Sequence, residues 1–439
     1  MQTRAGWIAL VLTGGLALAF APAVGRAQFP NGLDVGGRDA PLFPLPLSSN
    51  RPEDGGFYTA LEYKMLRMTK TIGNQPLAVR GFVDVDGSVQ RDLGGSFIIV
   101  GTTVVFNPGP PGPPGAFLGS GAEALNVNQL ATDWTYGPGY ELTLGYRFEN
   151  GWAVEANWTQ IFSVKYTAGA DSIPPGFAVG PVLADTFLFS PVVNFPIQYA
   201  GPASRLGVGN PGATYGIWNA ASSMTEQYTQ RYNEGNILGR YPVLTSDVSR
   251  TNVYVGYRFS WIWENFRWDT VARDFAGNAT AADHAIYNNI VSNRMYGPFI
   301  GAGQEFYLGK GFAIELAIDQ AAMLDIVKER ATYSLADRST EAKKQMVEYS
   351  FAPETEGKID LTWYPTRGIQ FRLGWDFMMF LNTVSNPYPV SFDFNNFNNF
   401  TNTAAGQPFA GLFNITHPIF ERIAIRYMDA IHGGVTFTW

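Results

Sequence analysis

Between residues 140 and 159, apolar side chains alternate with polar or charged ones at every second position. Successive side chains of a β-strand point to opposite faces, so this pattern predicts two strands that each have one apolar face. Asn150-Gly151 separates the two strands and favours a tight hairpin, because both residues tolerate positive φ. Each strand is about nine residues long, which is enough to cross a bilayer when the strand is tilted.

The same alternation recurs along the chain and predicts further hairpins. They turn at Glu264-Asn265, after which Phe266 and Trp268 resume the apolar face, and at 309–311 and 365–368. With one strand near each end of the chain, the pattern predicts about ten strands, within a range of roughly 8 to 14. The ten are 57–66, 139–149, 152–161, 252–263, 266–274, 297–308, 312–320, 356–364, 369–379 and 430–439.

Tight turns alternate with long connections in this arrangement. A compact soluble domain rarely carries such long connections, whereas outer-membrane barrels have short periplasmic turns and long extracellular loops. The predicted fold class is therefore all-β, a transmembrane antiparallel up-and-down β-barrel formed by residues 56–439. Charged residues near 321–346 have helical spacing within one of the connections. The predicted connections cover about 67–138, 163–250, 275–296, 321–355 and 380–429.

Aromatic residues gather beside the predicted tight turns. A barrel in a bilayer has belts of aromatic side chains at the two membrane interfaces. We therefore expect these residues to form one girdle at the periplasmic interface: Phe148, Trp152, Trp261, Trp263, Trp268, Trp363 and Trp439.

Residues 1–27 have the features of a secretory signal peptide. Arg4 precedes the apolar run Trp7–Phe20, and small residues lie where a signal peptidase cleaves. We expect cleavage after Ala27, with Ala23 as the alternative site and an uncleaved anchor as the alternative reading. Residues 28–55 are rich in Pro and Gly and predict an extended periplasmic leader, either a disordered tail or a plug segment.

Composition agrees with an exported membrane barrel. The chain has no cysteine, so it has no disulfide framework and is not a lipoprotein. Loss of residues 1–27 removes two arginines and no acid, which moves the net charge from −7 to −9 and argues against a nucleic-acid partner. Aromatic and charged residues each make up 15% of the chain, and a soluble domain has about 25% charged residues.

The face opposite the apolar one carries many charges. A dry interior does not hold so many unpaired charges, so the lumen is either wet or filled by a salt-bridged network. A pore with selective walls and a narrow barrel plugged by its own side chains both fit this pattern. The candidate pore-lining residues are Glu141, Arg147, Glu155, Arg258, Asp269, Glu305, Glu315, Asp319, Asp360, Arg372 and Asp376.

No residue set has the spacing of a known catalytic or metal site. The three histidines, His284, His417 and His432, form no metal-binding motif, and the chain has no Gly-x-Ser-x-Gly elbow. The segment 84–87 faintly resembles the start of a calcium loop but lacks the distal ligands, so a turn is favoured. We therefore predict no cofactor, no bound metal and no enzymatic activity.

The chain ends on an amphipathic strand. Val435, Phe437 and Trp439 share one face, and this ending is similar to the C-terminal signal that bacterial barrel assembly machinery recognises. We expect this strand to pair with the first strand and close the barrel. The predicted partners are thus outer-membrane lipid and the assembly machinery, with a homo-oligomer left open.

Several sequence segments resemble those of a predicted outer-membrane β-barrel family of planctomycetes, related to the Legionella-type pore-forming outer-membrane proteins. They are Leu-Gly-Tyr-Arg-Phe-Glu-Asn-Gly-Trp at 144–152, Tyr-Val-Gly-Tyr-Arg-Phe at 254–259 and Asn-Arg-Met-Tyr-Gly-Pro-Phe-Ile-Gly at 293–301, with the aromatic C-terminus. The resemblance covers most of the region after Tyr140 and departs over the first 138 residues. It implies passive diffusion or a structural surface role, and no catalytic residues.

Three functions follow from these patterns. The preferred one is a passive outer-membrane pore for ions and small hydrophilic solutes. The alternatives are a non-conducting structural or adhesive barrel that acts through its long loops, and a soluble secreted β-protein.

Overall fold

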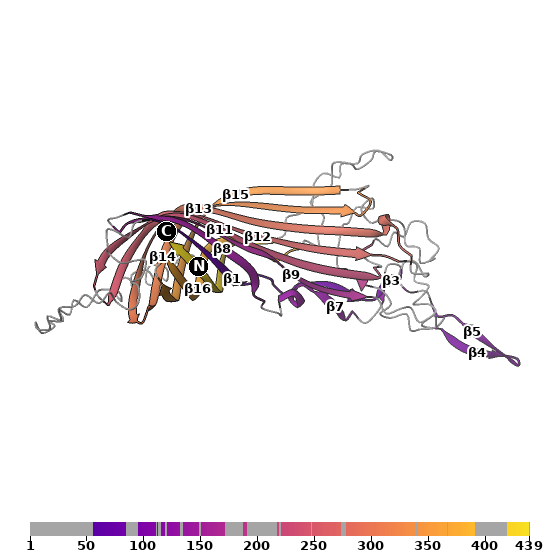
Figure 1. Ribbon diagram of the computed structural model, residues 1–439. Coiled ribbons are helices and arrows are strands. Elements are labelled where there is room, and N and C mark those ends of the chain that lie inside the picture. The colour runs from indigo at the N-terminus through magenta and orange to yellow at the C-terminus, as the bar shows by residue number, and fades with distance from the viewer. Residues whose placement is uncertain are drawn as a thin grey trace, which may run out of the picture. The chain divides into compact units, whose positions relative to one another are not determined.

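A computed structural model gives the fold of the chain (Figure 1). The predicted signal peptide, the leader and Trp439 lie outside the residues it describes. The described residues are 56–84, 95–110, 112, 116–118, 121–131, 135–148, 151–171, 188–190, 217–218, 221–246, 248–273, 278–338, 341–366, 368–390 and 419–438.

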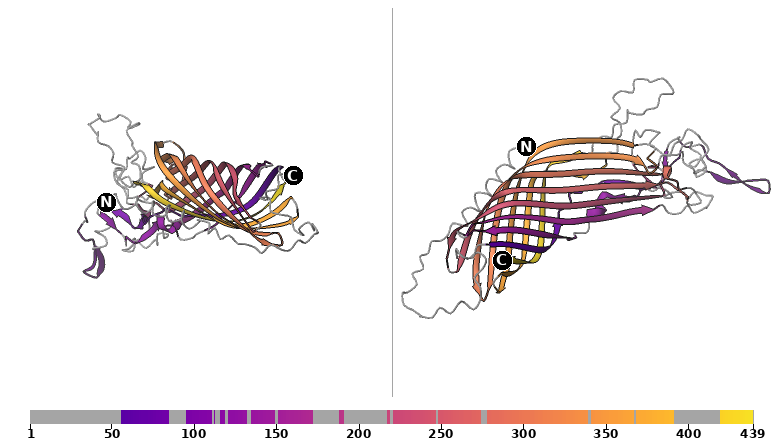
Figure 2. Two further views of the ribbon diagram at one scale, coloured as in Figure 1. Left: turned by 90° about the vertical axis from the view of Figure 1, so that its left-hand side faces the viewer. Right: turned by 45° about the horizontal axis from the view of Figure 1, so that its top comes forward.

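Ten antiparallel strands form a closed barrel, which confirms the predicted fold class (Figures 1 and 2). Around the ring the order is β1-β17-β16-β15-β14-β13-β12-β11-β9-β8, and β8 pairs with β1. The strands are β1 (Gly56–Met68), β8 (Gly137–Arg147), β9 (Ala153–Asp171), β11 (Ser223–Thr245), β12 (Ser249–Val271), β13 (His284–Gly309), β14 (Phe312–Leu335), β15 (Glu341–Thr366), β16 (Ile369–Tyr388) and β17 (Ile419–Thr438).

The last strand closes the ring against the first, as the sequence predicts. Phe437 on β17 lies opposite Thr59 on β1, and Val435 lies opposite Leu61. Pairing satisfies the backbone groups of both strands, which is required where a sheet contacts lipid.

The two ends of the barrel differ in their connections. At one end, β8 joins β9, β11 joins β12, β13 joins β14 and β15 joins β16 through turns of a few residues. We call this the short-turn end. At the other, the long-connection end, the chain between β1 and β8 holds the short strands β2 (Pro76–Arg80), β3 (Phe82–Asp84), β4 (Ser96–Val100), β5 (Thr103–Asn107), β6 (Ala116–Leu118) and β7 (Glu123–Asn126), and the 3-10 helix η2 (Val127–Ala131).

The second predicted hairpin is wrong, because its two strands form one continuous strand, β12. It runs without a turn through Glu264 and Asn265, and Trp263 pairs with Ser292 on β13 in the same register as Phe266 with Asn289. The apolar positions change from the outer face to the inner face at this point, and this change of phase resembles a turn in the sequence. The missing strand is β11, which lies inside the predicted connection 163–250. The strand count is therefore right although two of its members were assigned wrongly.

The barrel strands also extend well beyond the predicted boundaries. The segment 321–346 was expected to be a loop with helical character. Instead, 321–335 form the end of β14 and 341–346 the start of β15. Strands β13, β16 and β17 likewise extend into the predicted connections 275–296 and 380–429. Strands β11 to β15 are 23 to 26 residues long, whereas about 9–11 residues cross a bilayer.

The faces of the strands follow the predicted alternation near the short-turn end. Leu61, Leu144 and Leu373 are 56–59% exposed on the outer face, whereas Glu62, Lys64 and similar residues between such positions are buried inside. Within the described residues, no helix has the length and apolarity needed to cross a membrane.

Candidate functional site in the barrel interior

The candidate site is the lumen, the space enclosed by the inner faces of the strands. All of the predicted pore-lining residues except Asp269 point into it, and most line one internal cavity or its walls. Asp269 is on the outer face of β12, where it accepts hydrogen bonds from Arg267 at 2.6 and 2.7 Å. This placement is a correction, and it follows from the change of phase along β12.

One ion-pair network joins β1, β8, β15, β16 and β17 in the half of the lumen nearer the short-turn end. The Lys64 ammonium lies 2.7 Å from Asp376 and 3.2 Å from Glu141. The two ring nitrogens of His432 lie 2.8 Å from Asp360 and 3.3 Å from Asp376. These five side chains are almost completely buried and bind one another, so they form one ion-pair network rather than free wall charges.

A second network is centred on Arg258 of β12. Its guanidinium contacts Asp319 at 3.0 Å, Glu354 at 3.1 Å and Glu356 at 2.7 Å. Glu234 of β11 lies 3.7 Å away. A single arginine therefore contacts carboxylates from three other strands. Among them are Glu234, Glu354 and Glu356, whose carboxylate oxygens lie within 4.8 Å of one another.

A cavity of about 140 Å³ lies between these networks and the short-turn end. Arg147, Arg240 and Arg250 line it together with Glu155, Glu305 and Glu315. Several of these charges are paired. Arg240 Nε lies 2.8 Å from Glu155, and the Tyr254 hydroxyl donates a hydrogen bond of 2.7 Å to Glu315. The cavity is thus polar and large enough to hold water.

An apolar layer rich in methionine follows towards the long-connection end. We call it the methionine layer. The Tyr232 hydroxyl of β11 lies 3.4 Å from Met378 Sδ of β16, and the rings of Tyr232 and Phe380 are 6.3 Å apart. Strands β11 and β16 are separated by four strands in either direction around the ring, so these contacts cross the lumen. The layer contains Met68, Met295, Met323, Met378 and Met428 with Tyr232, Ile262, Phe299 and Phe380.

On the long-connection side of the methionine layer, one ion pair also crosses the lumen. Arg426 of β17 donates two hydrogen bonds to Glu264 of β12, at 2.6 and 2.8 Å. Arg426 also donates to the Val384 carbonyl and the Thr383 hydroxyl, at 2.8 and 3.1 Å. Its donors are therefore largely satisfied although the side chain is buried, which fixes the pair in one geometry.

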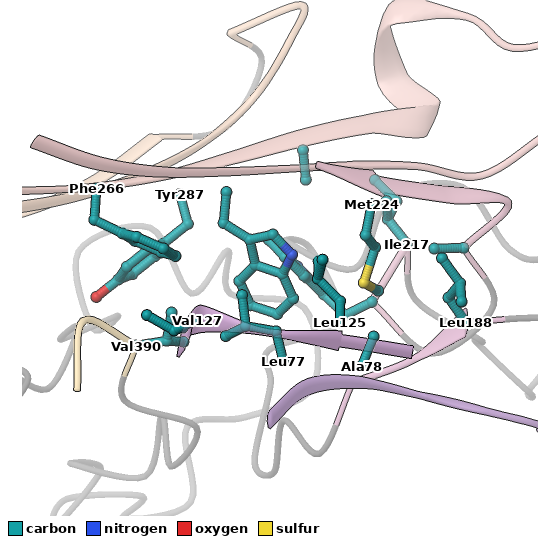
Figure 3. Close-up of a cluster of buried hydrophobic side chains, with 14 of the residues drawn as sticks. Leu77, Ala78, Leu125, Val127, Leu188, Ile217, Met224, Phe266, Tyr287 and Val390 are labelled. Atoms are coloured by element: carbon teal, nitrogen blue, oxygen red, sulfur yellow. The ribbon is translucent and has the colours of Figure 1, made fainter. Parts of the chain in front are cut away.

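Segments between the barrel strands pack against the inner face at the long-connection end (Figure 3). Trp268 and Tyr333 contact Trp218, whose indole nitrogen donates a hydrogen bond of 3.2 Å to the Tyr333 hydroxyl. Short strand β10 (Leu188–Phe189) pairs with β2, and β2 pairs with β7. The resulting core joins Leu77, Ala78, Leu125, Val127, Leu130, Leu188, Ile217 and Val390 to inner-face residues of β11 to β14.

The predicted aromatic girdle divides into three groups. Phe148, Trp152 and Trp363 are 41–45% exposed on the outer face near the short turns. Trp261 and Trp263 also face outwards, but they lie towards the other end of β12. Trp268 is 1% exposed and belongs to the inner core, so its assignment to the girdle was wrong.

Several residues of the networks were missed as candidates. Glu264 was assigned to a turn, and Glu354 and Arg426 were placed in connections that prove to be strands. Continuing the alternation of β15 beyond Glu356 puts Glu354 on the inner face, so this residue had a detectable signal. The partner of Arg426 lies 162 residues away in sequence, and no local pattern predicts that pairing.

The fold and the interior together define an outer-membrane β-barrel. Its lumen is charged towards the short-turn end and is crossed in the middle by the apolar methionine layer. The family described as the Legionella pneumophila major outer membrane protein precursor matches residues 115–412, more than half of the chain. The chain belongs to this family and is an outer-membrane protein. The planctomycete part of the resemblance stays a prediction.

Solved structures are similar to the chain over most of its length. The outer membrane protease OmpT from Escherichia coli is 8% identical, covers 88% of this chain and 97% of its own, and has a TM-score of 0.40. The CymD monoaromatic hydrocarbon channel is 10% identical, with 88% and 91% covered and a TM-score of 0.25. The Pseudomonas putida toluene transporter TodX is 8% identical, with 87% and 89% covered and a TM-score of 0.20. No curated protein matches the sequence significantly.

Proposed function

We propose that the protein is a structural surface barrel of the outer membrane whose lumen is closed to free diffusion. The observation that carries the proposal is the contact between strands on opposite sides of the ring. Arg426 binds Glu264 across the lumen. In the methionine layer, Tyr232 contacts Met378 and Phe380 across the lumen. Among the described residues, these contacts place side chains across the middle of the barrel.

The energetics of these contacts support a closed state at rest. Separating the buried Arg426–Glu264 pair leaves each charge without its partner, and removal of one partner from a buried pair costs about 3–5 kcal/mol. A continuous water path also exposes the apolar residues of the methionine layer, at about 25 cal/mol per Å² of apolar surface. Both terms favour the closed lumen over a hydrated pore.

Passage of ions and small hydrophilic solutes is the second candidate, because one observation favours it. The polar cavity near the short-turn end is lined by arginine and glutamate side chains from several strands. Methionine side chains are flexible and repack easily, so the layer above the cavity is the place where a path would open.

Conductance in planar bilayers distinguishes the two functions. The wild-type protein should give no stepwise conductance in 1 M salt, where charges are screened over about 3 Å. Arg426→Ala combined with Met378→Ala should produce steps, because it removes contacts on both levels. Lys328→Gln, on the outer face, should remain silent. Steady conductance of the wild-type protein would overturn the closed barrel and support the passive pore.

The remaining expectations belong to the same proposal. The short turns face the periplasm and the long connections face outwards, as in other outer-membrane barrels. Residues 1–27 are removed after Ala27, and the assembly machinery recognises the face of Val435, Phe437 and Trp439. Absence of catalysis remains a prediction, supported by the pairing of His432 and the inner carboxylates in ion-pair networks.

A further inference from the structure

The outer face changes from apolar to polar along the long strands β12 and β14. On β12, outward residues are apolar from Val253 to Trp263 and polar at Asn265. This apolar stretch has about the length that a tilted strand needs to cross a bilayer. On β14, the last apolar outward residue is Ile326, and the next outward residue is Lys328. The change therefore marks the membrane surface at the long-connection end.

Five basic side chains are gathered at this boundary. Two rows of paired residues cross strands β11 to β14 here. One row is Arg231, Trp263, Ser292 and Lys328, and the next row is Thr229, Asn265, Ile290 and Arg330. Lys165 on β9 is the partner of Thr229, and Arg294 on β13 is the partner of Trp261. We call Lys165, Arg231, Arg294, Lys328 and Arg330 the basic belt.

No acidic residue interrupts the basic belt. The outward positions between its members on β11 to β15 are occupied by Thr, Asn, Ser, Gln, Ile, Val, Tyr and Trp in these rows of the described strands. The nearest outward acid on β12, Asp269, is paired with Arg267 farther from the membrane boundary. Neighbouring strands lie about 4.8 Å apart, so the five cations share one compact surface. An excess of one charge over such an area attracts the opposite charge.

Two tryptophan rings hold members of the basic belt at the depth of the membrane surface. The Arg231 guanidinium lies 4.1 Å from the centre of the Trp263 ring, and the Arg294 guanidinium lies 5.2 Å from the centre of the Trp261 ring. Tryptophan prefers the membrane–water interface, and its ring face attracts a cation. These contacts keep both guanidinium groups beside the headgroups instead of extended into water.

Apolar surface suited to acyl chains lies directly below. Lys328 is the partner of Val347 on β15, and the next outward positions towards the short-turn end pair Ile326 with Tyr349 and Leu324 with Phe351. Val347, Tyr349 and Phe351 are 50–70% exposed. A single amphipathic ligand would thus meet cations at its headgroup and apolar side chains along its tails.

We propose that the basic belt binds the phosphate groups of an anionic lipid in the membrane leaflet at the long-connection end. Arginine and lysine are the residues that recognise phosphate, arginine through paired hydrogen bonds and lysine through its charge. The ligand is a lipid with a phosphorylated headgroup, because the cations lie immediately above the apolar band. The proposal concerns the outer face and is independent of whether the lumen conducts.

Native mass spectrometry of the purified full chain tests this proposal. The protein in micelles is titrated with diphosphorylated lipid A and, separately, with phosphatidylcholine, and the lipids retained are counted. We expect wild-type protein to retain lipid A at lower concentrations than phosphatidylcholine. Lys328→Gln/Arg330→Gln should bind lipid A about 10-fold more weakly, because each surface cation contributes to attraction of anionic lipid.

A matched variant removes two exposed positive charges elsewhere. Lys310→Gln/Arg338→Gln changes the turn between β13 and β14 and the connection between β14 and β15, and it should bind lipid A like the wild type. Unchanged heat-modifiable mobility shows that each variant is folded. The proposal is wrong if both lipids are retained equally, if the two double variants behave alike, or if inorganic pyrophosphate binds as tightly as lipid A.

Discussion

Arg426 and Glu264 connect strands that lie on opposite sides of the barrel. Strands β17 and β12 are separated by four strands in either direction, and the two side chains meet through hydrogen bonds of 2.6 and 2.8 Å. Gln230 donates a further hydrogen bond of 3.1 Å to the same carboxylate. The pair therefore links the two walls of the lumen directly.

Removal of Arg426 should destabilise the barrel strongly. Arg426→Ala leaves the buried Glu264 carboxylate without its cation, and such a loss costs about 3–5 kcal/mol. Urea unfolding in lipid vesicles, followed by tryptophan fluorescence, measures the change in free energy of unfolding. Arg330→Ala, which removes an exposed arginine from the outer face, is the control and should cost less than about 1 kcal/mol. Similar losses for the two variants would contradict the cross-lumen contact.

Two tryptophans on β12 should respond differently to truncation. Trp268 is buried in the inner core, so Trp268→Ala should cost about 3–5 kcal/mol of unfolding free energy. Trp263 faces outwards beneath Arg231, so Trp263→Ala should cost less. The same unfolding assay compares the two variants. A larger effect at Trp263 would show that β12 has been placed with its faces reversed.

Arginine should be tolerated on one face of β8 and not on the other. Leu142→Arg places a charge against lipid and should cost about 2–4 kcal/mol near the bilayer midplane. Thr143→Arg points into the polar cavity, where Glu141 is also present, and should be milder. Folding yield into vesicles and urea unfolding give the comparison. Equal effects would mean that the register of β8 is shifted by one residue.

The terminal strand should be needed for assembly. Phe437 is 43% exposed on the outer face and lies between Thr59 of β1 and Ile369 of β16. Phe437→Asp should lower the amount of protein in the outer membrane and leave aggregates or proteolytic fragments in the periplasm. Thr438→Ser, which keeps a hydroxyl on the opposite face, should assemble normally. Wild-type levels of the aspartate variant would show that recognition of the last strand does not depend on this face.

The sequence predicts the membrane-crossing part of the strands well, because lipid on one side and a polar lumen on the other impose a strict alternation. It fails where that contrast ends. On β11, the outward residues Thr225, Gln227, Thr229 and Arg231 are polar, and many inner ones are polar too, so no apolar stripe marks the strand. On β12, the inner face becomes apolar beyond Glu264. From there on, apolar residues at alternate positions indicate the inner face of the strand instead of the lipid-facing one.

The candidate site divides in the same way. The face of a residue such as Glu141 or Asp360 follows from its place in the alternation, and both lie in the lumen as predicted. Their partners depend on the order and stagger of ten strands. Lys64 meets Asp376 from a strand more than 300 residues away, and Trp218 meets Tyr333 in the inner core. Local sequence patterns contain no information on such pairings.

The change of phase at Trp263 and Asn265 has a consequence for the bilayer itself. On the short-turn side of this boundary, β12 is apolar outside, and beyond it the strand is apolar inside, like a strand of a water-soluble barrel. The strand therefore cannot slide deeper into a thicker membrane without placing Asn265 and Arg267 in hydrocarbon. A thicker bilayer must instead thin around the protein, at a cost that grows with each ångström of hydrophobic mismatch. The boundary thus adapts the barrel to membranes of one thickness, although its strands are long enough to cross a much thicker one.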